Sequence, residues 1–346
     1  MKIQNYNIGN ESPCFIIAEL SANHNGSLDV AIETIKAAKR SGADAIKLQT
    51  YTPNTMTIDH DNSHFKINEG TLWDGKTLFE LYGEAYTPWE WHETLFKVAE
   101  EEGLICFSSP FDLTAVDFLE KFNVPAYKIA SFEIQDIPLI EYAASKMKPI
   151  IISTGIANLE DIQLAVDICR KVGNEEIILL KCTSSYPAPL ELANLVTIQD
   201  IKKRFNVEVG FSDHTYGFLA PAVATTLGAK IIEKHFILNK SIGGPDADFS
   251  LDEKEFKAMV DAVRDTEKML GTVNYDVSKK VEKNRKFARS LFIVEDVKKG
   301  EKLTEKNIRS IRPGYGLHPK HYKEVLGKTF TNDFSKGEPL SLEMLK

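Results

Sequence analysis

The stretch PIIISTGIANLEDIQLAVDICRKVGNEEIILL, residues 149–180, holds the pattern that decides the fold. A short apolar run over 149–152 is followed by apolar residues at helical spacing over 159–172, and then by a second apolar run over 177–180. Strands that are apolar along their whole length are buried on both faces, which is typical of a parallel sheet. The stretch therefore predicts one strand–helix–strand unit.

The same unit repeats along the first 270 residues. Strands are expected at 15–18, 45–48, 104–107, 126–129, 149–152, 177–180, 207–210 and 230–233. Helices are expected at 28–41, 88–102, 114–122, 139–146, 159–172, 195–205, 218–227 and 253–270. Eight such units favour a closed (β/α)8 TIM barrel of the α/β class over a doubly wound sheet. No GxGxxG motif follows the first strand, which removes the usual dinucleotide-binding alternative.

The pattern changes after Gly271. The polar, charge-rich stretch 274–285 is predicted to be a linker. Residues 286–346 carry short apolar runs and several glycine turns, which indicate a small, loop-rich domain. We therefore predict a catalytic barrel over 1–273 followed by this second domain. A core of that size is marginal alone, so we expect the second domain to dock on another surface.

The composition argues against several classes of function. The 346 residues include 42 Lys and Arg and 50 Asp and Glu, a net charge of −8, whereas non-specific binding to nucleic acid needs a basic face. No run reaches the roughly 18 apolar residues of a membrane helix, and the first residues lack the apolar core of a signal peptide. Four cysteines without CxxC spacing predict reduced, buried thiols in a cytoplasmic protein.

Polar side chains end every predicted strand, where the catalytic groups of a β/α barrel are found. They include Glu19, Lys47, Gln49, Ser109, Lys128, Ser131, Glu133, Ser153, Thr183, Tyr186, Ser212, His214, Glu233 and His235. Strand ends meet solvent, which accounts for some hydroxyls. It does not account for Lys47 and Lys128 inside apolar strands, because an unpaired buried ammonium is costly. The lysines and hydroxyls predict a substrate that carries a phosphate and a carboxylate.

Two histidines indicate a metal site. His214 and His235 follow neighbouring strands, which lie about 4.8 Å apart, so both imidazoles can reach one ion. With Glu19 on the next strand, they predict an open site for a divalent transition metal. The alternative, two core histidines with satisfied hydrogen bonds, stays open. His24 is ambiguous because it is close to Glu19 in the sequence.

Many motifs, taken together and in order, resemble the sialic acid synthase family. They are AELSANHNGS (18–27), KLQT (47–50), SSPF (108–111), YKIAS (127–131), STG (153–155), CT (182–183), YP (186–187), GFSDH (210–214) and EKHF (233–236). The tail motifs KKGE (298–301) and RPG (312–314) are similar to the antifreeze-like SAF domain that ends these enzymes. The resemblance covers essentially the whole chain, which makes it specific.

The resemblance implies an enzyme that condenses phosphoenolpyruvate with an N-acetylated amino sugar to a nine-carbon 2-keto acid and releases phosphate. It also implies a divalent metal, commonly manganese, with magnesium or cobalt as alternatives. By position, phosphoenolpyruvate would be held by Lys47, Ser109, Lys128, Ser131, Ser153, Thr183 and Ser212, and the metal by His214 and His235. The sugar would contact Gln49, Tyr186, Asp246 and Phe287. Arg312 would come from the partner subunit of a domain-swapped homodimer.

A base is also required, because a water must add to the enolpyruvate carbon that carries the phosphate and then lose a proton. Glu19 is the candidate, with Glu133 and Glu233 as further participants.

One stretch points to a particular branch of the family. Members that make sialic acid carry an asparagine for the sugar after the second strand, whereas residues 70–82 here, GTLWDGKTLFELY, resemble the pseudaminic acid synthases. Their substrate, 2,4-diacetamido-2,4,6-trideoxy-L-altrose, is less polar, and an aromatic wall that includes Trp73 suits it. The alternative is that Trp73 only packs the loop.

Three rivals remain. The nearest is an N-acetylneuraminate or legionaminate synthase on the same scaffold. A second is a barrel enzyme that joins phosphoenolpyruvate to a phosphorylated sugar, and the third is a non-catalytic sugar-binding protein. The intact set of glutamate, lysines and histidines argues against the third.

Overall fold

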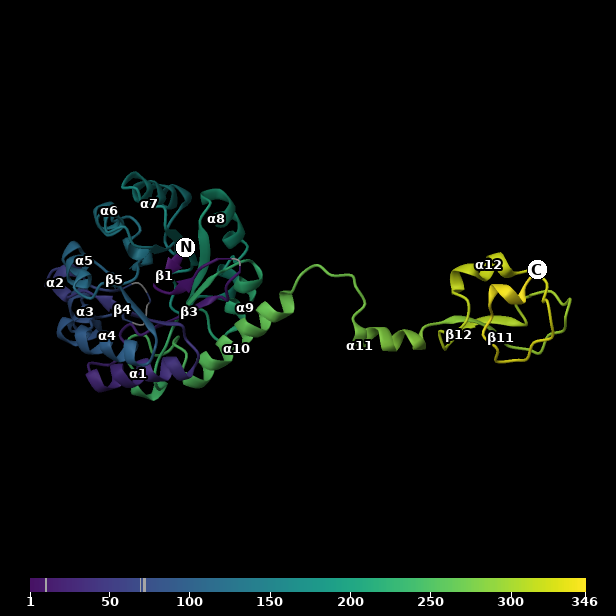
Figure 1. The fold of residues 1–346 in the computed structure, drawn as a ribbon. Helices are drawn as coiled ribbons and strands as arrows, with labels where there is room; N and C mark the ends of the chain where they lie inside the picture. The colour runs from purple at the N-terminus through teal and green to yellow at the C-terminus, as the bar shows by residue number, and fades with distance from the viewer. Residues whose placement is uncertain (10, 69, 71–72) are drawn as a thin grey trace. The chain divides into compact units, whose positions relative to one another are not determined.

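The computed structural model describes residues 1–9, 11–68, 70 and 73–346, which form two compact units, Met1–Gly271 and Thr272–Lys346. The first unit is a closed barrel of parallel strands in the order β10-β3-β4-β5-β6-β7-β8-β9 (Figure 1). The strands are β3 Phe15–Glu19, β4 Ala45–Thr50, β5 Ile105–Pro110, β6 Tyr127–Ile129, β7 Ile150–Ser153, β8 Ile177–Cys182, β9 Glu208–Asp213 and β10 Ile231–His235. The predicted (β/α)8 barrel is confirmed.

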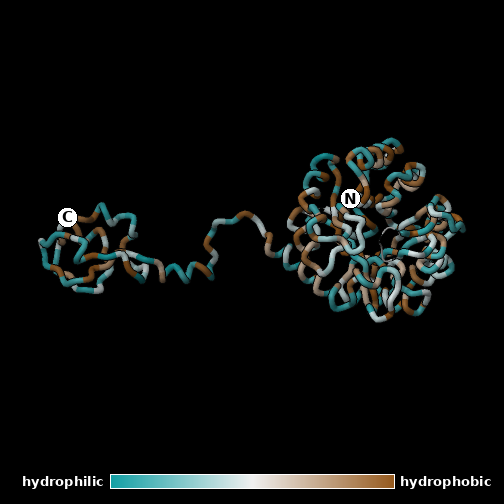
Figure 2. Tube along the Cα trace, turned by 180° about the vertical axis from the view of Figure 1, so that it is seen from behind, coloured by the Kyte–Doolittle hydropathy of each residue, from teal (hydrophilic) through white to brown (hydrophobic). Residues whose placement is uncertain are grey.

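A helix follows each strand on the outside of the barrel. These helices are α1 Leu28–Arg40, α4 His92–Glu101, α5 Leu113–Glu120, α6 Ile137–Ser145, α7 Leu159–Lys171, α8 Thr197–Phe205, α9 Leu219–Thr226 and α10 Glu253–Leu270. In α10, the buried residues Phe256, Met259, Val260 and Val263 recur at spacings of three and four. Hydrophobic and hydrophilic stretches accordingly alternate along the outer helices (Figure 2), as expected for helices that bury one face.

Several elements, most of them short, were not predicted from the sequence. The N-terminal hairpin, β1 Lys2–Ile3 with β2 Tyr6–Asn7, packs Ile3 and Ile8 against the inner apolar layer of the barrel. The excursion after β4 contains α2 Pro53–Met56 and α3 Leu78–Ala85. Single turns of 3-10 helix lie at Trp89–Trp91, Ser131–Glu133, Leu190–Leu192, Lys240–Ile242, Lys283–Phe287, Pro319–His321 and Leu342–Met344.

The second unit has its own small core. It begins with α11 Lys279–Glu282, which lies within the stretch predicted as a linker, and continues with the antiparallel pair β11 Ser290–Ile293 and β12 Ile308–Ile311 and the helix α12 Tyr322–Val325. Its fully buried apolar residues are Leu291, Ile293, Val297, Leu303, Ile308, Val325, Phe330 and Leu340.

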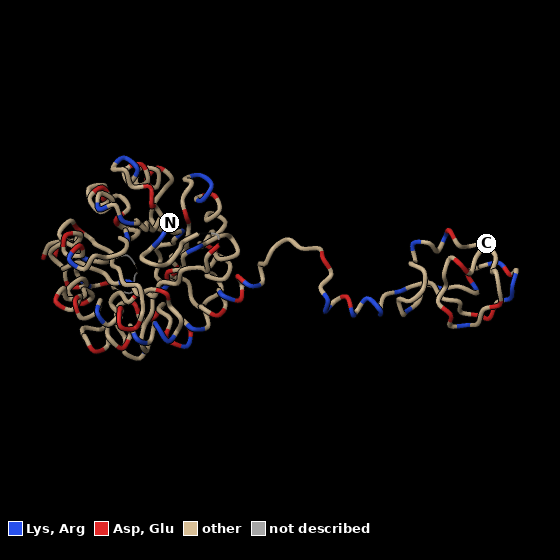
Figure 3. The backbone as a smooth tube through the Cα atoms, viewed as in Figure 1, with Lys and Arg blue, Asp and Glu red and all other residues tan. Residues whose placement is uncertain are grey.

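In the view of Figure 3, residues of both charge signs are scattered over the barrel. Within the described part of the chain, no helix is both long and apolar enough to cross a lipid bilayer.

Candidate active site

The inward side chains change from apolar to polar along the strands, and this change builds the site. On β10, Ile231 belongs to the inner apolar layer, and Glu233 and His235 follow on the same face. On β4, Lys47 and Gln49 continue the inner layer in the same way. Because all strands are parallel, their polar ends meet at one mouth of the barrel.

Two lysines and two glutamates form a buried charge cluster at this mouth. Lys47 Nζ lies 2.5 Å from Glu19 Oε2 and 3.8 Å from Glu233 Oε1. Lys128 Nζ lies 3.5 Å from the same Glu233 oxygen. All four side chains are less than a tenth exposed. The anionic partner expected for the buried lysines is therefore supplied, in the unliganded chain, by these carboxylates.

The two glutamates differ in proton affinity. Burial raises the pKa of Glu19, and the neighbouring Glu233 carboxylate reinforces the shift although Lys47 opposes it. Burial also acts to raise the pKa of Glu233, but Lys128 and Lys47 together outweigh it and hold that pKa below its ordinary value. Glu19 is therefore the better proton acceptor of the pair.

A cluster of hydroxyls, Ser131, Ser153 and Ser184, lies at the ends of β6, β7 and β8. Ser131 Oγ accepts a hydrogen bond from Gly155 N at 3.0 Å. Ser153 Oγ and Ser184 Oγ are buried without a hydrogen-bond partner. Residue 155 has to be glycine, because a Cβ there would lie 2.1 Å from Ser184 Oγ and 2.7 Å from Ser131 Oγ. The hydroxyl cluster suits a phosphate or carboxylate.

The structure brings Ser109 and Ser212 to the charge cluster but not Thr183. Ser109 Oγ accepts from Lys47 Nζ at 3.2 Å, and Ser212 Oγ donates to Glu233 Oε1 at 3.2 Å. The Thr183 hydroxyl instead donates to Leu192 O at 3.1 Å, so its predicted contact with phosphoenolpyruvate has no support.

The next residue, Ser184, instead has its hydroxyl in the cluster beside Gly155. It was not predicted because two adjacent hydroxyl residues after a strand cannot be told apart by type. Strand alternation, which puts neighbouring residues on opposite sides, is the one signal in the sequence that bears on this choice.

The two histidines face one another with ring centroids 5.4 Å apart. His214 Nδ1 donates to Thr183 O at 3.0 Å, which leaves Nε2 free to bind a cation. His235 Nδ1 is buried without a hydrogen-bond partner and lies 3.6 Å from Asp246 Oδ2. Glu19, the further residue of the predicted metal site, is paired in the unliganded chain with Lys47 and accepts from Gln49 Nε2 at 2.9 Å.

These donors fit a metal that takes most of its ligands from water or substrate. The residues with described positions include no group of three or more His, Cys, Asp or Glu side chains able to hold an ion by themselves. The two imidazoles, with Asp246 Oδ2 close by, suit a divalent transition metal. Such a metal would keep open coordination positions, as in catalytic sites.

The residues assigned to the sugar by position lie around the histidines. Gln49 Nε2 also donates to Ser21 Oγ at 3.0 Å, and Ser21 Oγ donates to Asp246 Oδ2 at 2.5 Å. The Tyr186 ring lies 4.4 Å from the His214 ring, centroid to centroid. These contacts form one wall of the mouth.

Trp73 reaches the same wall. Its ring centroid lies 5.9 Å from that of Tyr186, and its Nε1 donates to Pro245 O at 3.3 Å. The residue therefore packs its loop and also borders the mouth. Residues 71 and 72 of the aromatic stretch lie outside the described residues.

Phe287 and Arg312 belong to the second unit, where both side chains are exposed. Gly314 N, on the loop of Arg312, donates to Lys286 O at 2.9 Å, so the two segments lie side by side.

His24, the ambiguous histidine, is structural. It is fully buried, its Nδ1 accepts from Gly26 N at 3.1 Å, and its Nε2 lies 3.3 Å from Thr87 Oγ1. Burial lowers its pKa to about 4, so it is neutral at physiological pH.

Buried polar atoms without hydrogen-bond partners gather at the mouth of the barrel. Across the described ranges they are Glu19 Oε2, Asn23 Oδ1, Glu133 Oε2, Ser153 Oγ, Ser184 Oγ, Thr215 Oγ1, Glu233 Oε2 and His235 Nδ1. Every one of them lies at the carboxyl end of a barrel strand or in the loop that follows. Such groups are rare in folded proteins, and here they mark the place where a ligand would supply the missing partners.

Comparison with known proteins agrees with this geometry. Residues 34–275 match the model of the NeuB family, and residues 288–346 match that of the SAF domain. The chain belongs to the NeuB family. The resemblance to sialic acid synthases seen in the motifs is thereby confirmed, as is the SAF domain.

Several NeuB-family relatives are similar over nearly their full length. The chain is 52% identical over 340 residues to a pseudaminic acid synthase of Campylobacter jejuni, with 98% of each chain covered. It is 52% identical over 332 residues to a pseudaminic acid synthase of Helicobacter pylori, covering 96% and 97%. The crystal structure of an N-acetylneuraminic acid synthetase from Leptospira borgpetersenii, in complex with citrate, covers 82% of this chain and 94% of its own, with 31% identity and a TM-score of 0.72.

Glu133 is a further titratable group at the mouth of this NeuB-family barrel. It is half-buried after β6, and its Oε2 has no hydrogen-bond partner. Burial raises its pKa to about 7, although Lys128 opposes the shift. The group therefore changes charge close to neutral pH, which is the range where a general acid or base is effective.

This raised pKa predicts a pH-dependent stability. Between about pH 4.5 and 7, Glu133 keeps a proton in the folded state that the unfolded chain has lost. Its contribution to the free energy of unfolding is therefore full at low pH and is lost as the pH rises through 7. Glu133→Gln cannot titrate. Relative to wild type, it is expected to gain on the order of 1–3 kcal/mol in the free energy of unfolding between about pH 5 and pH 8.

Urea unfolding of both proteins across this range measures the difference, with the exposed Glu191→Gln as control. A difference that does not change with pH would contradict the raised pKa.

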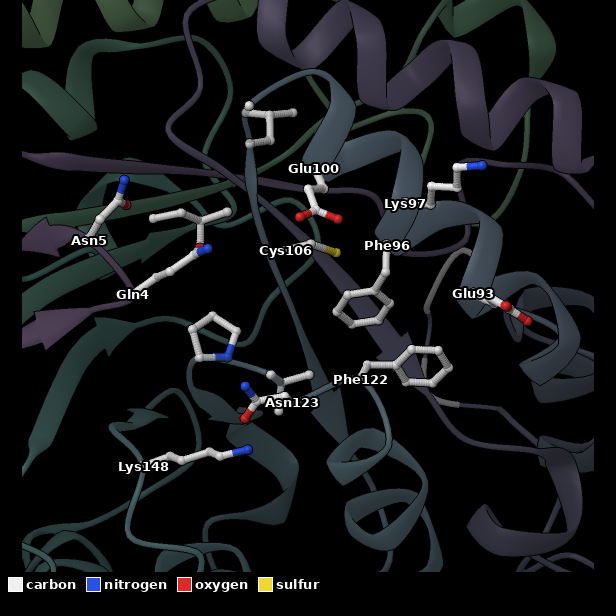
Figure 4. A pocket seen from close by; sticks show the side chains of 15 residues that line it. Gln4, Asn5, Glu93, Phe96, Lys97, Glu100, Cys106, Phe122, Asn123 and Lys148 are labelled. Carbon is white, nitrogen blue, oxygen red and sulfur yellow. The ribbon is translucent and has the colours of Figure 1, made fainter.

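A cavity of about 750 Å³ lies away from the mouth, near the amino ends of β5 and β6 (Figure 4). It is bordered by the hairpin residues Gln4 and Asn5 and by Phe96 and Phe122, whose rings stack at 4.9 Å. None of the predicted site residues lines it. In β/α barrels the amino end carries stability and not chemistry, so the size of this cavity does not identify it as the active site.

Proposed function

We propose that this chain condenses phosphoenolpyruvate with 2,4-diacetamido-2,4,6-trideoxy-L-altrose, releasing phosphate and forming the nine-carbon acid pseudaminic acid. The observation that carries the proposal is the set of unpartnered buried polar atoms beside two buried lysines and two facing histidines. The identity of 52% to pseudaminic acid synthases, over nearly the whole chain, supports the choice of sugar.

Phosphoenolpyruvate binding is assigned to the charge cluster and the hydroxyl cluster. Lys47 and Lys128 would exchange part of their contact with the glutamates for the carboxylate and phosphate of the substrate. The hydroxyls of Ser109, Ser131, Ser153, Ser184 and Ser212 would hold the remaining oxygens. Such multiple contacts fix a charged substrate in one orientation.

The metal is assigned to His214 and His235, with Mn²⁺ as the proposed ion and Mg²⁺ or Co²⁺ as alternatives. When bound, it would supply a Lewis acid for the aldehyde oxygen of the open-chain sugar.

In the bond-forming step the C2–C3 π electrons of phosphoenolpyruvate form a bond from C3 to the aldehyde carbon of the sugar. The aldehyde oxygen takes up the C=O π electrons and a proton and becomes a hydroxyl, and C2 is left electron-poor. Water then adds to C2 and loses a proton, for which Glu19 is the proposed acceptor because it is buried at the mouth with a raised pKa. The C2–O bond to phosphate breaks, phosphate leaves, and C2 becomes the ketone. Glu133 and Glu233 are the further candidates for moving protons in these steps.

The sugar is assigned to the wall made by Gln49, Asp246, Tyr186 and Trp73. Its aromatic part suits a sugar that lacks the 6-hydroxyl and carries two acetamido groups.

We propose that the chain works as a domain-swapped homodimer in which Phe287 and Arg312 of one copy complete the sugar site of the other. Several large apolar side chains on the loops around the barrel mouth are exposed, including Phe132, Tyr216 and Leu219. Val273 and Tyr275, which follow the barrel, are also exposed, and an exposed apolar surface of this kind is typical of an interface. The four free, buried cysteines support a reducing cytoplasmic setting.

Complementation between two inactive variants tests the swap. His214→Ala lacks a barrel ligand and Arg312→Ala lacks the tail residue, so each alone is expected to be nearly inactive. In a mixed dimer, the intact barrel of one copy receives the intact tail of the other. Coexpression at equal amounts should restore about a quarter of the wild-type activity, because half of the dimers are mixed and each has one complete site. Mixtures as inactive as the separate variants would contradict the swap.

The proposed reaction is tested by phosphate release. Purified protein with Mn²⁺ should release phosphate only when phosphoenolpyruvate and the diacetamido sugar are both present, with one nine-carbon product formed per phosphate. Phosphate release from phosphoenolpyruvate alone at the same rate would contradict a condensation.

A further inference from the structure

A second buried ion pair lies directly behind the two histidines. Lys234 Nζ lies 2.7 Å from Asp213 Oδ2, and both side chains are fully buried. The two residues are register partners on β10 and β9. Each precedes one of the histidines in the sequence, Asp213 before His214 and Lys234 before His235. Strand alternation puts the pair on the opposite face of the sheet from the imidazole of His235.

The pair ties down the turn that carries His214. Asp213 Oδ1 accepts from Thr215 N at 2.8 Å, while its other oxygen meets Lys234. Lys234 Nζ also donates to Thr215 O. The residues before and after His214 are therefore both fixed to β10, the strand that carries His235.

A contribution to stability does not by itself explain why a buried ion pair is present here. Taking two charges out of water costs free energy that their attraction rarely exceeds, and apolar residues of similar volume often serve a core as well or better. Buried ionic pairs are better explained where they fix a geometry. Groups that orient metal-binding side chains through hydrogen bonds are typical examples, and their removal weakens metal binding about 10- to 100-fold.

We infer that the Asp213–Lys234 pair is a positioning device that holds the His214 and His235 imidazoles at the separation needed to bind one divalent cation. The inference rests on the metal assignment within the proposed function, and it concerns residues that touch neither substrate nor metal.

The test is the affinity for Mn²⁺ alone, measured by titration calorimetry on full-length protein without substrates. The double variant Asp213→Asn/Lys234→Met removes both charges and keeps similar volumes. It is expected to bind Mn²⁺ about 10- to 100-fold more weakly than wild type. The metal concentration for half-maximal activity should rise by the same factor, with kcat at saturating metal largely retained.

A matched control separates positioning from general stability. Asp44 and Arg264 form a less deeply buried pair at the amino end of β4, away from the histidines, where Asp44 Oδ2 lies 2.9 Å from Arg264 and accepts from Ile16 N. Asp44→Asn/Arg264→Met should lower the melting temperature but leave Mn²⁺ affinity unchanged. The milder single variant Asp213→Asn, which keeps an acceptor for Thr215 N, is measured alongside in case the double variant does not fold.

The outcomes are distinct. Wild-type Mn²⁺ affinity in the folded Asp213 variants, with a loss of melting temperature like that of the control, would overturn the inference and leave the proposed function standing. Wild-type protein that binds no Mn²⁺ would overturn both. Protein that binds Mn²⁺ but does not turn over the sugar would overturn the proposed function alone.

Discussion

Replacing Lys47 by methionine is expected to lower kcat/KM for phosphoenolpyruvate by roughly 10²- to 10³-fold. The ammonium is buried, lies within 4 Å of two carboxylates and donates to Ser109. It is placed to meet the substrate anion in a region that excludes water, where a charge contributes far more than it would at the surface. Methionine keeps most of the volume and removes the charge.

The Lys47→Met measurement needs a control for stability, because the change leaves Glu19 buried without its cation. A lower melting temperature is expected, so activity is compared per folded protein. Lys181→Met is the matched control: Lys181 lies on another barrel strand, β8, is half-buried, and donates to Cys182 O. A Lys47 variant with the kcat/KM of the Lys181 variant would show that the ammonium does not bind phosphoenolpyruvate.

Replacing His214 by alanine is expected to remove metal-dependent turnover, with a loss on the order of 10³-fold or more in kcat. A chelator should reduce wild-type activity to the same residual level and should have no further effect on the variant. The physical reason is the arrangement of the ring: Nδ1 is fixed to Thr183 O, and the ring centroid lies 5.4 Å from that of His235.

A second buried histidine provides the control for this result. His92 is fully buried, with Nε2 2.8 Å from Thr50 Oγ1, and burial lowers its pKa to about 4. His92→Ala should cost stability and leave the metal dependence intact. Metal-dependent turnover that survives in His214→Ala would contradict the assignment of the metal ligands.

The barrel could be predicted well from the sequence because apolar runs recur along the chain at regular intervals. Every strand of the closed barrel was found from an apolar run, as in 177–180, although β8 continues to Cys182. The runs ended too early because the inner face of the barrel becomes polar where the chemistry lies. The hairpin of β1 and β2 gave no such signal, since strands of two residues are too short to show a period.

The residue types of the site were predicted better than the contacts between their side chains. Lysines inside apolar strands implied an anion, and the structure places both beside Glu233. That Glu19 is paired with Lys47 in the unliganded chain depends on side-chain directions that residue spacing does not give. The same holds for Thr183, whose hydroxyl turns to Leu192, and for the pair of Asp213 and Lys234.

The most direct test of the central claim is the kcat/KM of the purified protein, with Mn²⁺ and phosphoenolpyruvate, for three sugars measured side by side. These are 2,4-diacetamido-2,4,6-trideoxy-L-altrose, its manno counterpart that leads to legionaminic acid, and N-acetylmannosamine. We predict a preference of at least about a hundredfold for the first, as expected when a site built for particular groups meets a sugar that lacks or misplaces them. An equal or better kcat/KM with N-acetylmannosamine or with the manno sugar would contradict the account.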